Sequence, residues 1–420
     1  MKRTPMGRIT AAAAVALMGI GLAACSSAST DTGTSTTGSS DQGQSSAASA
    51  GSGSSDSSAA ESGDTIKIGF FSPQSGFAAS DGKSALDAAN LAVKHINAGG
   101  GMNGASIQLV PYDDGSDAKQ AVSIATKLTT QDNVSAVVSG SYSDQTLAAA
   151  SIFQRAGIPM TAAYAVNPGI PATGDGMFQI ATSGTVEGRA GAVALIDKLG
   201  VKKVAIIAID NDFGNALIDG FKQEADKLGA TIVSTDKNQF GEKDFGPVID
   251  KGIAAGAEGF YIPQYSAEAQ QFLTAYRQRN LTQPIVGTEG IDSTLQFIEP
   301  NAKLADGMVF TTVLNRDSTD PATKKFLTDF QDAYGHAPDM VAATTYDAVM
   351  VLKAAADNEK STDAAALKKG ITDLTNYPGA AGTIEKFVDR VSIHPVELEV
   401  FKDGGVHHYA TVDDPAIITP

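Results

Sequence analysis

Residues 201–234 read VKKVAIIAIDNDFGNALIDGFKQEADKLGATIVS and contain one complete unit of the fold. The uninterrupted apolar run Val204–Ile209 is typical of a buried strand, and Thr231–Ser234 is a second run of β type. Between them, Asn215–Leu228 has its apolar residues at helical spacing. A strand, a helix and a strand in this order predict a parallel pair of strands with the helix packed on the sheet.

The same alternation extends in both directions from this unit. Further strands are expected at Ile66–Phe71, Ile107–Tyr112, Ser135–Val138, Gly259–Ile262, Ile285–Gly287 and Met308–Thr312. Further helices are expected after the capping-box sequence Ser84–Asp87 and at Ala118–Thr129, Thr146–Ala156, Glu187–Leu199 and Ala267–Arg279. The alternation indicates parallel sheets that are covered by helices on both faces.

The order of elements changes after about residue 313. Helices are predicted at Thr323–Tyr334, Val341–Asn358 and Ala364–Leu374, and a β-hairpin follows at Glu397–Phe401 and His407–Thr411. This order favours two Rossmann-like α/β lobes between which the chain crosses more than once. We expect lobe I to comprise residues 64–184 and 313–383, and lobe II to comprise residues 185–312 and 384–414.

The N-terminus has the features of an export signal. Lys2, Arg3 and Arg8 precede an uncharged, mostly apolar stretch that is too short to span a bilayer. Residues 1–24 are therefore predicted to be a lipoprotein signal peptide, because Leu22-Ala23-Ala24-Cys25 resembles a lipobox whose cysteine is lipidated. The alternative is an ordinary signal peptide with a chance cysteine near its cleavage site.

Residues 25–63 are predicted to be a tether. After Cys25 the segment is almost entirely Ser, Gly, Thr and Ala and contains no Lys or Arg. Such a composition cannot bury enough apolar surface to offset the entropy of ordering. The predicted location is extracytoplasmic, with the protein anchored to the cell membrane by the lipid on Cys25.

Composition excludes several classes of protein. The chain has 420 residues, enough for two or three domains, and a formal net charge of −16, which argues against nucleic acid as a partner. A single cysteine cannot form an intramolecular disulfide, and no Cys/His cluster has zinc-ligand spacing. We therefore expect no metal site and no structural disulfide.

The sequence also lacks the common catalytic signatures. It has no phosphate loop, no G-x-G-x-x-G at the start of a helix, and no H-E-x-x-H. The five histidines are scattered, and the pair His407-His408 is expected to face solvent. Asp113-Asp114 follows a strand, where solvated acids and helix caps are common. We expect no catalytic residue, no cofactor and no enzymatic activity.

Several segments in consistent order resemble the branched-chain amino acid (Leu/Ile/Val)-binding proteins of ABC importers, which have the type I periplasmic-binding fold. The resemblance covers roughly Thr65 to Tyr409. It rests on Ile66–Gly69 with Ser75-Gly76, Val93–Gly100, Tyr112–Gly115 with Ala118–Val122, Ala156–Pro159, Gly241–Phe245 and Thr344–Ala348. It implies that an amino acid is bound between two lobes that close on it by a hinge motion.

The resemblance implies how the polar ends of the ligand are held. Ser143 matches the serine that binds the ligand's α-carboxylate, and a helix beginning beside it suits an anion. Tyr164 matches a residue whose backbone carbonyl reaches the ammonium, whereas Val166 replaces an expected threonine. In lobe II, Tyr265 matches a tyrosine that reaches the polar end, and Glu289 matches the acid that pairs with the ammonium.

The pocket for the ligand's side chain departs more from the family. Phe213 matches a pocket aromatic, but Asp81 and Val341 stand where aromatic residues are expected. Tyr142 and Tyr164 can refill that space. The expected ligand is leucine, isoleucine or valine.

Other functions remain open at this point. The ligand can be another amino acid, an amide, a urea-like compound or an aromatic compound, and the protein can be a ligand-sensing receptor instead of a transport component. The expected macromolecular partner is the transmembrane permease of an ABC transporter, and the protein is expected to be a monomer.

Overall fold

The computed structural model describes residues 65–420. The predicted signal peptide (1–24), the lipidated Cys25 and the tether (25–63) lie outside the described residues. Within the described part of the chain, no helix is both long and apolar enough to span a membrane.

The first sheet has eight strands in the order β11-β12-β13-β5-β4-β3-β1-β2. Five early strands form its parallel part: β1 (Thr65–Ser72), β2 (Ser106–Asp113), β3 (Ala136–Ser139), β4 (Met160–Ala162) and β5 (Met177–Gln179). Three late strands extend it: β11 (Thr375–Gly379), β12 (Gly382–Val388) and β13 (Val391–Ile393). The pairs β11–β12 and β12–β13 are antiparallel, so the sheet is mixed.

The second sheet has seven strands in the order β15-β14-β10-β9-β8-β6-β7. Its parallel strands are β6 (Lys203–Ile209), β7 (Thr231–Asn238), β8 (Gly259–Ile262), β9 (Ile285–Gly287) and β10 (Val309–Thr312). The antiparallel hairpin β14 (Val396–Lys402) and β15 (Gly405–Val412) completes it. The strand–helix–strand unit predicted within residues 201–234 is thus confirmed: it consists of β6, a helix and β7.

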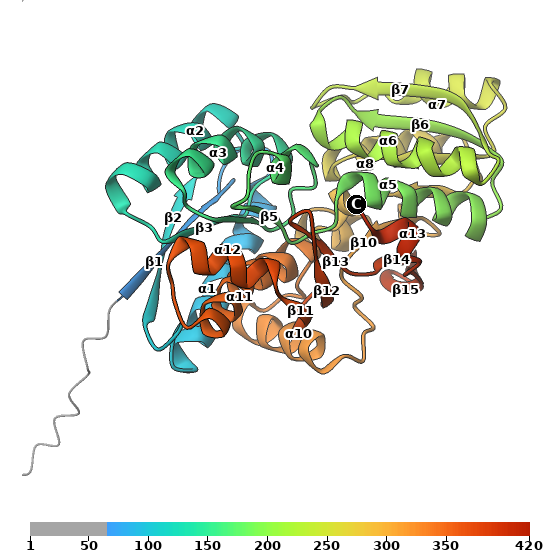
Figure 1. Ribbon diagram of the computed structural model, residues 1–420. Coiled ribbons are helices and arrows are strands. Elements are labelled where there is room, and N and C mark those ends of the chain that lie inside the picture. Colours follow the sequence, from blue (N-terminus) through green and yellow to red (C-terminus); the bar gives the residue numbers. More distant parts are fainter. Residues whose placement is uncertain (1–64) are drawn as a thin grey trace, which may run out of the picture. The chain divides into compact units, whose positions relative to one another are not determined.

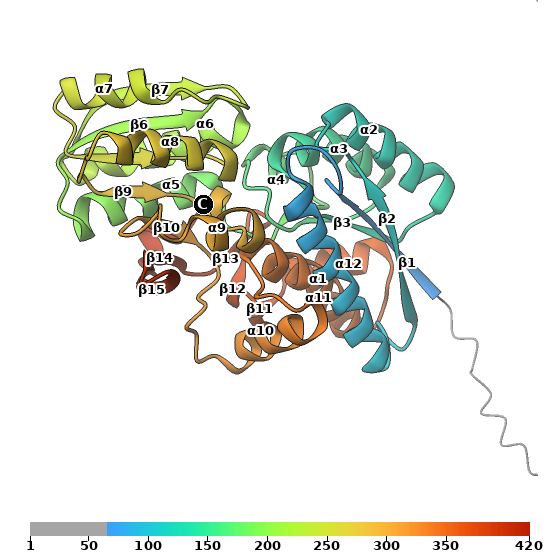
Figure 2. The same ribbon diagram turned by 180° about the vertical axis from the view of Figure 1, so that it is seen from behind.

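Helices flank both sheets (Figures 1 and 2). The sequence segments that form the first sheet also contain α1 (Ala79–Ala98), α2 (Ala118–Lys127), the π-helical turn η1 (Leu128–Asp132), α3 (Ser143–Ala156), α4 (Gly169–Ala172), α10 (Pro321–Tyr334), α11 (Met340–Glu359) and α12 (Ala364–Thr372). Those that form the second contain α5 (Gly184–Ala192), η2 (Val193–Lys198), α6 (Asp212–Lys227), α7 (Gly246–Ala254), α8 (Ser266–Gln278), η3 (Glu289–Ile291), η4 (Thr294–Ile298), α9 (Glu299–Asn301) and α13 (Pro415–Ile418).

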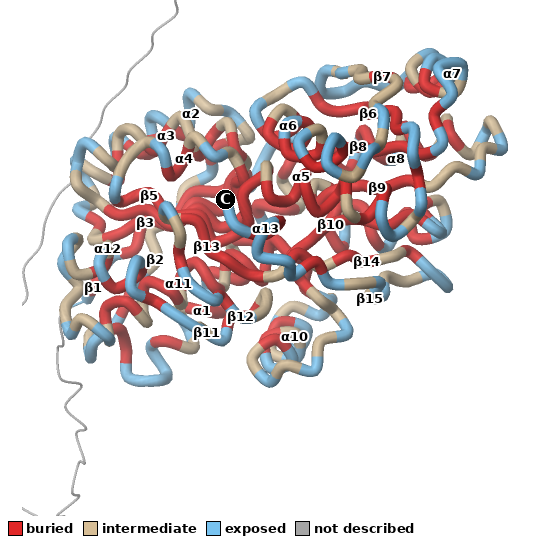
Figure 3. The backbone as a smooth tube through the Cα atoms, turned by 45° about the vertical axis from the view of Figure 1, so that its right-hand side comes forward, coloured by how far each residue is buried: buried red, intermediate tan, exposed pale blue. Residues whose placement is uncertain are grey.

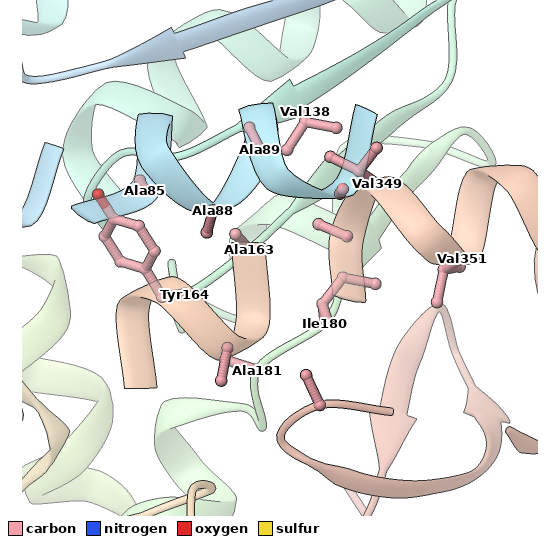
Figure 4. Close-up of a cluster of buried hydrophobic side chains, with 14 of the residues drawn as sticks. Ala85, Ala88, Ala89, Val138, Ala163, Tyr164, Ile180, Ala181, Val349 and Val351 are labelled. Carbon is pink, nitrogen blue, oxygen red and sulfur yellow. The ribbon is translucent and has the colours of Figure 1, made fainter. Parts of the chain in front are cut away.

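The cores lie between the sheets and their helices. Figure 3 shows the strands mostly in the buried class, while exposed residues concentrate on the outer turns and helices. In the first core, small residues of α1 (Ala85, Ala88 and Ala89) and valines of α11 belong to one buried cluster, which also contains Tyr164 (Figure 4). Alanines allow α1 and α11 to pack closely against each other and against the sheet.

The chain passes between the two sheets three times within residues 65–420: from β5 to β6, from β10 to α10, and from β13 to β14. The predicted repeated crossing is therefore confirmed. One predicted boundary is wrong, because β12 and β13 pair within the first sheet, and residues 384–393 thus belong with it and not with lobe II. Residues 375–393 contain many polar residues and several glycines, so their hydrophobic pattern does not predict these strands.

Helix α1 begins at Ala79, six residues earlier than its capping-box sequence, with Ser84 as the N-cap, predicts. The hydroxyl of Ser84 does not cap this helix but donates to Asp339 Oδ1 at 2.6 Å. The short strands β4 and β5 and the helix α7 were also not predicted. Three-residue strands and a helix interrupted by glycine give too little periodic signal to be recognised.

Candidate functional site: a cavity lined from both sheets

One small cavity of about 20 Å³ is lined by side chains from elements of both sheets. Most of these residues follow the carboxyl end of a parallel strand, which is where open α/β sheets bind ligands. The first-sheet side supplies the starts of α1, α3 and α11 and the loop after β4, and the second-sheet side supplies the starts of α6, α8 and η3. The lining residues are Asp81, Tyr142, Ser143, Tyr164, Phe213, Tyr265, Glu289, Gly290, Met340 and Val341.

Eight of the nine residues predicted to contact a ligand line this cavity. Val166 does not, because its side chain lies in the hydrophobic core. Its backbone N–H donates to Ser143 Oγ at 3.2 Å, and its carbonyl accepts from Gly184 N. Val166 therefore contacts Ser143 through its backbone, and its role in ligand binding stays a prediction.

Ser143 is the first residue of α3, and Tyr142 precedes the helix. No side chain caps the first turn of α3, so its free N–H groups and the positive end of the helix dipole are available to an anion. Since Ser143 Oγ accepts a hydrogen bond from Val166, its own O–H remains free to donate in the same region. This end of the cavity is suited to a carboxylate.

Glu289 is the first residue of η3, and only 5% of it is exposed. Its backbone N–H donates to Glu187 Oε1 at 2.9 Å, but its own Oε2 is buried without a hydrogen-bond partner. Burial, together with the nearby Glu187 and Asp292, raises the pKa of Glu289 well above its usual range. An unpaired buried carboxylate that lines a cavity is suited to a cation.

Aromatic rings form one wall of the cavity. The rings of Tyr142 and Tyr265 stack with centroids 4.7 Å apart and planes within 6° of parallel. Phe213 stacks on Tyr265 at 4.7 Å, and Tyr164 meets Tyr142 edge-on at 5.8 Å. Because Tyr142 comes from the first-sheet side and Tyr265 from the second, this stack joins the two halves directly.

A second hollow of about 320 Å³ lies beyond this stack and shares Tyr142 and Tyr265 with the first. Phe77 and Phe240, both partly exposed, line it with their rings 4.6 Å apart. Neither phenylalanine was predicted as a site residue, because each stands in a loop where apolar residues have no periodic neighbours. The tyrosine pair thus separates an inner cavity from an outer one.

Asp81 is the second acid in the lining, and it lies in the first turn of α1. The Tyr142 hydroxyl donates to its Oδ2, whereas Oδ1 is buried and lacks a partner. Burial, followed by the charge of Asp339, raises the pKa of Asp81 to about 7, although the nearby hydroxyl of Ser293 and the hydrogen bond from Tyr142 oppose the shift. None of the ten lining residues is Lys, Arg or His, so the cavity is acidic.

Hydrogen bonds also join the two halves beside the cavity. Asp339, at the start of α11, accepts from the backbone N–H of Thr294 at 3.3 Å, and Thr294 Oγ1 donates to the Pro338 carbonyl.

Two residues that line the cavity, Met340 and Gly290, were not predicted as site residues. The described residues contain no cluster of three or more metal-ligating side chains.

Two α/β halves that enclose an acidic and aromatic cavity define a small-molecule binding protein. The chain matches the model of the Periplasmic binding protein family over residues 65–398, and it belongs to that family. Its relatives and structural neighbours are solute-binding proteins of transporters and not enzymes.

Relatives and a solved structure support this assignment. An "Amino acid binding protein" of Pseudomonas aeruginosa is 33% identical over 54% of this chain, and the match spans 61% of that protein's length. "Leu/Ile/Val-binding protein homolog 3" of Brucella melitensis is 28% identical over 80% of this chain and 91% of its own. A branched-chain amino acid transporter substrate-binding protein of Streptococcus pneumoniae, solved in complex with isoleucine, has a TM-score of 0.75 and 26% identity over 83% of this chain and 99% of its own.

Proposed function

We propose that this protein is the extracytoplasmic substrate-binding component of an ABC importer, and that it captures a branched-chain amino acid for delivery to the permease. The observation that carries the proposal is the placement of Ser143 and Glu289. They line one cavity but come from opposite sheets, so a single ligand can bind both halves.

The ligand's carboxylate is placed at the start of α3. Uncapped N–H groups and the free donor of Ser143 satisfy an anion there without a basic side chain. The ligand's ammonium is placed at Glu289, whose unpaired Oε2 accepts a charge-assisted hydrogen bond. A cation at this point also favours the ionised form of Glu289 against the effect of burial.

The aromatic wall formed by Tyr142, Tyr164, Phe213 and Tyr265 is assigned to the ligand's side chain. The relatives named for leucine, isoleucine and valine, and the neighbour bound to isoleucine, favour an aliphatic amino acid. A cavity of about 20 Å³ cannot hold one without rearrangement, so binding requires the Tyr142–Tyr265 stack to separate and re-form. We assign this opening to the three crossovers, with the sheets as two lobes that close on the ligand.

The alternative ligands within this class differ in charge. An anionic aromatic acid is disfavoured, because two acids and no basic residue line the cavity. A neutral amide is disfavoured too, because it supplies no cation to pair with the buried carboxylate of Glu289.

We also propose that the lipid on Cys25 holds the protein at the cell membrane and that the tether 25–63 lets it reach the permease.

Calorimetric titration tests the proposed ligand. The purified protein is unfolded and refolded to remove carried-over ligand and is then titrated with leucine, isoleucine, valine, benzoate and acetamide. We expect saturable one-to-one binding of a branched-chain amino acid, weakened at least tenfold by Glu289→Gln and by Ser143→Ala. The matched control is Glu242→Gln, because Glu242 lies outside the cavity lining. Binding of benzoate or acetamide but of no amino acid would overturn the proposal.

A further inference from the structure

Asp81 lines the cavity and has an acceptor without a partner. It is 97% buried, and the Tyr142 hydroxyl occupies its Oδ2, but Oδ1 has no hydrogen-bond partner. The proposed carboxylate and ammonium positions, at Ser143 and Glu289, do not use this oxygen. A buried carboxylate oxygen without a donor is costly and calls for an explanation.

A second unpaired group lies next to it. Ser293, in the loop between η3 and η4, is 99% buried, and its Oγ also has no hydrogen-bond partner. Its hydroxyl is close enough to Asp81 to lower the pKa of that carboxyl, yet the two do not form a hydrogen bond with each other. Asp81 belongs to the first-sheet half and Ser293 to the second, so the two unpaired groups lie close together where the halves meet.

Charge in the surroundings leaves Asp81 available. Asp339, Asp292 and Glu289 are the other acids around this end of the cavity, and no basic residue lines it. Arg316 does not pair with Asp81, because it forms ion pairs with Asp292 and Glu399. No described donor forms a hydrogen bond with Oδ1, so a donor on a ligand can take this position.

We propose that Asp81 determines specificity, and that its free Oδ1 binds a hydrogen-bond donor on the side chain of the bound amino acid. This inference rests on the proposed function and extends its range of ligands: an amino acid with an O–H or N–H on its side chain binds at the same site, and more tightly than the aliphatic amino acid of the same shape. Ser293 Oγ then accepts from, or donates to, the same group.

Threonine and valine provide a direct test, because they have the same shape and differ by one hydroxyl in place of a methyl. We expect the wild-type protein to bind threonine about tenfold or more tightly than valine, since a hydrogen bond to a carboxylate favours one and an unpaired buried oxygen penalises the other. In Asp81→Leu the preference should reverse toward valine, and in Asp81→Asn it should weaken but remain. The control is Asp87→Asn, an acid on the outer side of the same helix paired with Lys83.

The outcomes separate this inference from the proposed function. If valine and threonine bind equally, or if Asp81→Leu leaves their ratio unchanged, the role of Asp81 is wrong although amino acid binding stands. If no amino acid binds to the refolded wild-type protein, the proposed function itself fails. Circular dichroism of Asp81→Leu shows whether that variant is folded, and Asp81→Asn gives the ratio if it is not.

Discussion

Asp347 shows what a buried acid does when the protein supplies its partners. It lies in α11, and its two carboxylate oxygens accept from the backbone N–H groups of Ala380 and Ala381 at 2.6 and 2.9 Å. These amides lie at the turn between β11 and β12, so the side chain ties the hairpin to the helix. Burial still raises the pKa of Asp347 to about 7, because the two hydrogen bonds only partly offset it.

This shift predicts a pH dependence of stability. The pKa in the folded protein lies above the value in the unfolded chain, so the contribution is complete below about pH 4 and is lost as the pH rises through about 7. Between pH 6 and 8 the wild type should lose on the order of 1 kcal/mol of unfolding free energy through this group. Asp347→Asn should lack that loss, as measured by urea unfolding at both pH values. An identical pH dependence in the two proteins would contradict the assignment.

At the residue scale, the sequence located the strand-end positions of the site but not their interactions. Ser143, Tyr265 and Glu289 lie in the loops or helix starts that follow predicted strands, so their convergence could be expected. The contact between Asp81 and Tyr142 joins residues 61 positions apart, and nothing local encodes it. The backbone of Val166 contacts the site, while its side chain enters the core.

At the element scale, glycines decide how closely α5 and α6 pack. A side-chain carbon added at Gly188 would lie 2.2 Å from the Leu217 carbonyl oxygen and 2.8 Å from the Phe221 nitrogen. Both atoms belong to the backbone of α6 and cannot move without displacing the helix. Because the cavity residue Phe213 lies in the first turn of α6, this contact also positions one wall of the site.

Gly188→Ala should therefore destabilise the protein by about 3 kcal/mol, since an added methyl group in a closely packed contact forces a backbone shift. Thermal unfolding measures the effect. Gly405→Ala is the matched control, because an added carbon there would meet no atom closer than 3.4 Å. Equal melting temperatures for the two variants would show that α5 and α6 can separate at little cost.

Long periodic elements were predictable, whereas short or locally unpatterned ones were not. The helix α11 and the strand β6 have continuous apolar patterns and were located to within a few residues. Strand β11 is largely exposed, and β13 joins the sheet by pairing with β5, which is about two hundred residues away in the sequence. Tertiary pairing of this kind leaves no mark on a local hydrophobic pattern.

At the scale of the whole molecule, one partly buried cation connects a crossover to the second half. Arg316 lies in the segment between β10 and α10, where it binds Asp292 and Glu399, the latter at 2.7 Å. Burial alone lowers the pKa of Arg316, but the two carboxylates outweigh it and raise the pKa. Asp292 also accepts from Thr312, so the network fixes the start of the crossover.

Replacing this cation should destabilise the protein strongly. Arg316→Met leaves two buried carboxylates without their partner, and breaking a buried ion pair in this way costs about 3–5 kcal/mol. Chemical denaturation measures the loss, and Lys237→Met, in an exposed pair with Asp210, serves as control with a cost below about 1 kcal/mol. A similar small loss for Arg316→Met would show that the crossover does not depend on the network.

The central claim is that opposite halves hold opposite ends of one amino acid. Binding of leucine is compared with that of 3-methylbutylamine, which lacks the carboxylate, and 4-methylpentanoate, which lacks the ammonium, in the wild type and in Glu289→Gln. We predict that removing the ammonium weakens binding to the wild type far more than to Glu289→Gln, because the two deletions remove the same interaction. An equal loss in both proteins would mean that the ammonium does not meet Glu289, and would contradict the account.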